Sequence, residues 1–202
     1  MNRGPDDKPY TADDWRIRVL PARWSLEEMP IREDLQILRS LPGVQAATVV
    51  NAQALSGGGS STSLHTEPNQ KGRRGDVNYF QVDEQGVATF GVEIVEGRDL
   101  DAAVVTKPER NSSTSPPEIL LTRDAAREMF PQGSALGKTV YTGTSDPITI
   151  VGIIDHMHGS WPMWDKVGNV ALFPVISDES RPHIHALVVD LKRVTDGELL
   201  GP

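Results

Sequence analysis

Two polar, low-complexity stretches divide this chain and limit where a hydrophobic core can form. Residues 56–76 start with a run of Ser and Gly and end in a basic cluster, and residues 107–117 place Asn, Ser and Thr between prolines. Segments of this composition bury too little apolar surface to offset the entropy lost on ordering, so both are predicted to be mobile, exposed loops. The core must therefore come from the segments around and between them.

Those segments carry the patterns of strands and short helices. Apolar residues recur at helical spacing from Ile31 to Leu41. Residues 123–130 form a second amphipathic pattern, with Thr122 as its N-cap. Strand patterns occupy residues 16–20, 44–55, 76–83, 92–95, 118–121, 138–142, 147–154, 170–176 and 185–191. Because strands and helices do not alternate strictly, we predict an α+β fold.

The composition excludes several classes of function. The 20 Lys and Arg against 28 Asp and Glu leave a net charge of −8, without the basic excess that phosphate neutralisation requires, so no nucleic acid is expected as a partner. Cysteine is absent, which removes thiol catalysis and thiolate metal sites. No stretch approaches the roughly 20 apolar residues of a membrane span. The acidic start does not match a secretory signal, so we expect any export signal to lie outside this sequence.

Catalytic motifs are also missing. No Gly-x-Ser-x-Gly nucleophile elbow occurs, and residues 58–62 lack both the closing glycine and the preceding strand of such a motif. Acidic pairs such as Asp99 and Asp101 are expected to be solvated, because nothing in the pattern marks them as buried. We therefore expect no catalytic residues, no cofactor and no enzymatic activity.

Four histidines form two closely spaced pairs, His156 with His158 and His183 with His185. Residues two apart on a strand point to the same face, so neighbouring segments could bring four imidazoles together around zinc, nickel or copper. Each pair lies at the edge of an expected element, where exposed histidines are common, and the spacing fixes no further ligand. The histidines support a metal site only as an alternative hypothesis.

The loop 156–168 is unusually apolar for a connection. It places Trp161, Met163 and Trp164 within four residues. Large apolar side chains are costly on a surface unless something covers them. They either cover the domain's own core or contact a partner, since Trp and Met are enriched where proteins dock.

A collinear series of short segments resembles one family. Each segment is a turn, a cap or a close helix contact with apolar neighbours, and the series covers about residues 30–192. The segments are Leu41–Val44, Phe90–Arg98, Ile119–Thr122, Ala125–Pro131, Leu136–Val140 and Ile150–Asp155. Together they resemble the MacB-like periplasmic core domain of FtsX-type ABC transporter permeases.

This resemblance implies a two-lobed periplasmic domain of an inner-membrane protein. Residues 15–55 and 165–202 would form a membrane-proximal, porter-like βαβ lobe, and residues 56–164 an inserted, smaller mixed lobe. Residues 1–14 would be a flexible lead-in. The family's transmembrane helices are expected to lie outside this sequence.

The resemblance also implies a function. The domain would be non-catalytic and would relay motion driven by a cytoplasmic ABC ATPase. Its partners would be the transmembrane helices of the same permease, the ATPase indirectly, and a second permease copy, a periplasmic adaptor or a cargo protein, which Trp161 and Trp164 would help to contact. The competing hypothesis is a periplasmic metal- or solute-binding module that uses the paired histidines.

Overall fold

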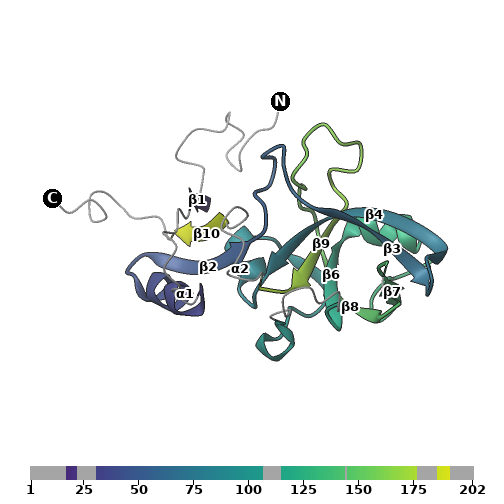
Figure 1. Ribbon diagram of the computed structural model, residues 1–202, viewed down its shortest axis with the longest axis horizontal. Helices are drawn as coiled ribbons and strands as arrows, with labels where there is room; N and C mark the ends of the chain where they lie inside the picture. The colour runs from purple at the N-terminus through teal and green to yellow at the C-terminus, as the bar shows by residue number, and fades with distance from the viewer. Residues whose placement is uncertain (1–16, 22–30, 107–114, 144, 177–185, 192–202) are drawn as a thin grey trace.

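Two β-sheets and three short α-helices make up the described part of the computed structural model, which comprises residues 17–21, 31–106, 115–143, 145–176 and 186–191 (Figure 1). The elements are β1 (Ile17–Pro21), α1 (Ile31–Ser40), β2 (Val44–Val50), β3 (Ser61–Glu67), β4 (Lys71–Val82), α2 (Gly86–Phe90), β5 (Ile94–Gly97), a 3-10 turn (Ala102–Val104), β6 (Glu118–Thr122), α3 (Arg123–Met129), β7 (Thr139–Tyr141), β8 (Pro147–Ile154), β9 (Val170–Pro174) and β10 (Ala186–Leu191). The mixture confirms the predicted α+β class. No helix of the described residues has the length and apolarity of a membrane span.

The larger sheet closes on itself. Its strands follow the order β5-β8-β6-β9-β4-β3-β7, and β7 also pairs with β8, so every strand except β5 belongs to a closed barrel. The pairs β4–β9 and β6–β8 are parallel, whereas β3 pairs antiparallel with both β4 and β7. Closure leaves the barrel strands without free edges.

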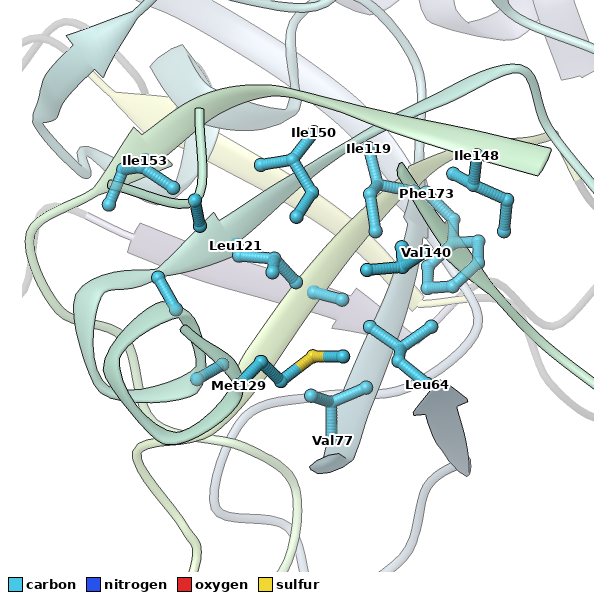
Figure 2. Packing of buried hydrophobic residues seen from close by; sticks show 14 of the residues in the cluster. Leu64, Val77, Ile119, Leu121, Met129, Val140, Ile148, Ile150, Ile153 and Phe173 are labelled. Atoms are coloured by element: carbon cyan, nitrogen blue, oxygen red, sulfur yellow. The ribbon is translucent and has the colours of Figure 1, made fainter. Parts of the chain in front are cut away.

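Successive side chains of the barrel strands point to opposite faces and form two apolar clusters, one on each side of the barrel wall. The interior cluster takes side chains from all the closing strands, and Met129 of α3 reaches into it (Figure 2). On β4, Val77 and Tyr79 belong to the interior, whereas Phe80 and Val82 belong to a cluster on the outer wall. Helix α2 covers that outer cluster, with the rings of Phe80 and Phe90 5.5 Å apart.

The smaller sheet has the order β1-β10-β2, with both pairings antiparallel. Strands β1 and β2 are therefore parallel, with α1 between them in sequence and β10 between them in space, which is a split βαβ arrangement. Helix α1 buries Leu35 against Ala47 and Val49 of β2. The order of the sheet also means that the barrel is inserted between β2 and β10.

Residues 56–76 are not a mobile loop as predicted, because most of them form the hairpin of β3 and β4. Its turn places Asn69 and Gln70 at φ of 59° each, and Leu64 is fully buried inside the barrel. Gly75 lies so close to Met129 that an added Cβ would be 2.6 Å from its Cγ. A barrel wall has a solvent face, so this pairing accommodates a polar strand that the composition had suggested was disordered.

The predicted lobe boundaries also need correction. Strand β9 pairs with β4 and β6, so residues 170–174 belong to the barrel and not to a lobe formed by residues 15–55 and 165–202. The inserted unit carries the seven-stranded sheet, whereas the resemblance implied that the inserted lobe would be the smaller one. The expected lead-in 1–14 and residues 107–114 of the second expected loop lie outside the described residues.

Candidate partner-contact site

The loop between β8 and β9 carries Trp161, Met163 and Trp164, and the structure brings these three residues together. The rings of Trp161 and Trp164 lie edge to face, with centroids 6.2 Å apart at 90°, and both side chains are half-buried. Met163 is 95% exposed. The tryptophans thus support one another, and the methionine is presented to solvent.

The first end of this loop is fixed to the barrel wall. The amide of Ser160 donates a hydrogen bond to Asn78 Oδ1 at 3.1 Å, and both side chains are fully buried. Gly159 lies against the same asparagine, because an added Cβ would be 2.3 Å from Asn78 Nδ2. Buried hydrogen bonds in close-packed surroundings restrict the loop to a defined position.

The second end is fixed by charge. Lys166 Nζ lies 2.6 Å from Glu128 Oε1 of α3, and Asn169 Nδ2 donates to Glu128 Oε2 at 2.7 Å. The hydrogen bond with Glu128 raises the pKa of Lys166. Thr122, which caps α3, also donates to the carbonyl of Gly168 at 2.8 Å. The loop is therefore anchored at both ends to the barrel and its helix.

A second loop, residues 51–60, lies beside the first at the top of the view in Figure 1. The amides of Leu55 and Gly57 donate to the carbonyls of Gly159 and Ser160 at 3.0 and 2.8 Å. Leu55 is 50% exposed and has a φ of 57°, a left-handed conformation that is unfavourable for a bulky side chain. An exposed leucine held in a strained backbone is a candidate contact residue that sequence reasoning missed.

The histidines do not form a site in the described part of the chain. His156 and His158 are exposed on either side of the buried Met157. His156 Nδ1 lies 3.1 Å from Asp155 Oδ2, and Arg123 pairs with the other oxygen of Asp155. The hydrogen bond with His156, followed by the charge of Arg123, lowers the pKa of Asp155.

Whether the pairs bind metal stays a prediction. Within the described ranges, no group of three or more His, Cys, Asp or Glu side chains is arranged to hold a metal ion. His183 and His185 lie outside those ranges. Titration of the wild-type chain and of a His156→Ala, His183→Ala variant with zinc tests the hypothesis, which requires saturable binding that the variant loses.

The fold and this loop pair define a class: an α+β domain with a barrel inserted into a split βαβ sheet, presenting an anchored apolar loop. The chain belongs to the MacB-like periplasmic core domain family, whose model matches residues 6–199. It is a periplasmic domain of a MacB/FtsX-type ABC transporter permease, as predicted from the resemblance. Among curated proteins, no sequence matches the chain significantly.

Solved structures share the fold at low sequence identity. The periplasmic region of MacB from Actinobacillus actinomycetemcomitans matches with a TM-score of 0.51 and 16% identity, over 82% of this chain and 66% of that one. The extracellular domain of the ABC-type transporter YknZ from Gram-positive bacteria gives 0.51 and 13%, over 87% and 81%. A domain of a putative permease from Porphyromonas gingivalis gives 0.50 and 19%, over 80% and 67%. This chain therefore spans just under two thirds of the length of the MacB region.

Proposed function

We propose that this domain is a non-catalytic relay, which passes motion driven by a cytoplasmic ABC ATPase, through the transmembrane helices of the same permease, to a periplasmic partner. Family membership supports the presence of those helices and of the ATPase. The observation that carries the contact with a partner is the doubly anchored loop with Met163 95% exposed between half-buried tryptophans.

The closed barrel suits such a relay. The closed strands leave no free edge and pack around an apolar interior, so the barrel resists deformation, and a loop that is anchored to it at both ends moves with it. A relay also requires a partner that prefers one of two positions of the domain, because only differential binding shifts a conformational equilibrium. A second permease copy, an adaptor or a cargo protein that contacts Met163 would supply that preference.

Site-specific photocrosslinking in cells tests the proposal. The full permease carries a photoreactive amino acid at Met163 in one strain and, as a matched control, at the exposed Gln132 beyond α3 in another. We expect a discrete protein adduct from position 163 that changes in yield when the cognate ATPase is inactivated. No adduct above that of position 132, or one indifferent to ATPase activity, would contradict the relay.

A further inference from the structure

The contact between the two sheets is made by side chains. Strand β2 runs beside β4, yet its backbone ladder in the described residues is with β10. Asn51, just beyond β2, bridges the gap: its Oδ1 accepts a hydrogen bond from the amide of Gln81 at 2.8 Å, and its Nδ2 donates to the carbonyl of Tyr79 at 3.4 Å. The junction therefore depends on individual side chains where a sheet would have a continuous ladder.

Asp83 is the centre of this junction. It follows β4 directly and is 1% exposed. Its Oδ1 accepts from Thr48 Oγ1 of β2 at 2.8 Å and from the amide of Gln85 at 3.0 Å. Its Oδ2 lies 2.5 Å from Arg39 Nη2 of α1. One carboxylate thus joins the barrel to both α1 and β2 of the smaller unit.

Arg39 makes the reciprocal set of contacts. Its Nε and Nη2 donate to the carbonyl of Ala47 at 3.0 and 2.6 Å, which fixes the end of α1 to β2. Its Nη1 donates to Glu84 Oε1 at 3.2 Å. A planar guanidinium with several fixed donors suits such a junction, because its contacts have one geometry. Separating the sheets would leave the buried carboxylate of Asp83 without its cation, which is costly.

Apolar side chains surround this centre, and Val50 of β2 belongs to the outer cluster of the barrel together with Phe80. Val105 and Ile176, which belong to segments leaving the barrel, pack against Leu35, Ala47 and Val49. Apolar contacts alone do not fix one geometry, because they are non-directional. The directional part of the junction is therefore the charged one.

We propose that Arg39 and Asp83 form the coupling contact that fixes the three-stranded sheet against the barrel and sets how completely a displacement of one unit is passed to the other. Its use in transport rests on the proposed relay, whereas the coupling itself is a property of this chain alone. The two can therefore fail separately.

Pulsed electron paramagnetic resonance on the 202-residue chain tests the coupling. Since the chain has no cysteine, introduced pairs are labelled uniquely. Gln36→Cys on α1 with Gln132→Cys beyond α3 reports the distance between units, and Gln70→Cys with Gln132→Cys reports the barrel alone; all three positions are exposed. The variants are Arg39→Ala and, as matched control, Arg74→Ala, which removes the Arg74–Asp76 pair within the barrel.

In Arg39→Ala we expect the inter-unit distance distribution to broaden about twofold, with the barrel pair unchanged, because local opening spares cooperative units whose own contacts remain. Arg74→Ala should change neither distribution. The double variant Arg39→Gln, Asp83→Asn, which restores a neutral hydrogen-bonding pair, should return most of the wild-type width.

Three outcomes overturn the proposal. They are an unchanged inter-unit distribution in Arg39→Ala, equal broadening of both label pairs, and equal broadening in Arg74→Ala. If Arg39→Ala fails to fold, Asp83→Asn alone is measured with the same label pairs. Asp83→Asn places an amide against the guanidinium, and an unchanged inter-unit width there also refutes the coupling.

Discussion

The barrel interior and the junction between the sheets are built in opposite ways. Inside the barrel, backbone ladders close on themselves around apolar side chains, including Ile119, Leu121 and Ile150, none of which is exposed. At the junction, side chains of Arg39, Thr48 and Asp83 replace the ladder. A closed ladder distributes its strength over many residues, whereas a junction of this kind depends on a few. The same domain thus contains one unit held by a continuous ladder and one junction held by a few side chains.

The largest expected effect comes from a substitution in the barrel interior. Ile119→Ala removes a fully buried side chain from the interior cluster, and we expect the free energy of unfolding to fall by about 3 kcal/mol. Urea denaturation measures the loss. Ile37→Ala on α1, where the side chain is 55% exposed, is the control and should change stability by less than about 0.5 kcal/mol. Equal costs at the two positions would contradict the contrast.

The barrel was only partly predictable from the sequence. Strands with strong apolar patterns, such as β6 and β8, were located to within a residue or so, as were α1 and α3. Strand β3 was missed because Leu64 is its one large apolar residue, so a polar composition concealed a strand with one wet face. Closure by the pairing of β3 with β7 and the inclusion of β9 depend on pairing between distant segments, which local patterns do not encode.

The candidate site was likewise only partly predictable from the sequence. The tryptophans and Met163 stand out in the sequence because they are apolar residues in a connecting loop. Leu55 adjoins a glycine-rich run, and its importance comes from a backbone angle and from its hydrogen bond to Gly159. The junction was also invisible, because Arg39 and Asp83 are ordinary charged residues until the fold brings them together.

A second prediction asks whether the contact loop moves with the barrel. In Gly159→Ala the added methyl would meet Asn78 Nδ2 at 2.3 Å, and we expect a loss of about 2 kcal/mol with altered near-ultraviolet dichroism from the tryptophans. Gly58→Ala is the matched control, since an added Cβ there has no atom within 4 Å. If both variants behave like the wild type, the loop moves independently of the barrel.

A third prediction concerns the junction and pH. Burial raises the pKa of Asp83 above its ordinary 3.8, although the charge of Arg39 and hydrogen bonds from Gln85 and Thr48 oppose that rise. A carboxyl group whose pKa is higher in the folded than in the unfolded state stabilises the fold at pH values below its unfolded-state pKa. This stabilisation is lost as the pH rises through the folded-state pKa.

The stability of the wild type relative to Asp83→Asn should therefore fall as pH increases from about 4 towards neutrality. Urea denaturation of both proteins across this range measures the difference, which we expect to be smaller than the effect of Gly159→Ala. A difference that grows with pH would show that Arg39 outweighs the burial of the carboxylate. The charge pair at the junction would then add to stability near neutral pH.

The smallest expected effect is at Leu55, where a substitution should affect the contact with a partner but should not lower the stability of the fold. Asparagine tolerates the left-handed backbone better than leucine does, so Leu55→Asn relieves strain while removing a side chain that is already 50% exposed. We expect stability to be unchanged or to rise by up to about 1 kcal/mol in thermal or urea denaturation. In the same variant, the crosslink from position 163 should weaken, because the two loops are hydrogen-bonded to one another. A clear loss of stability would instead assign Leu55 to the packing of the loop and remove it from the contact site.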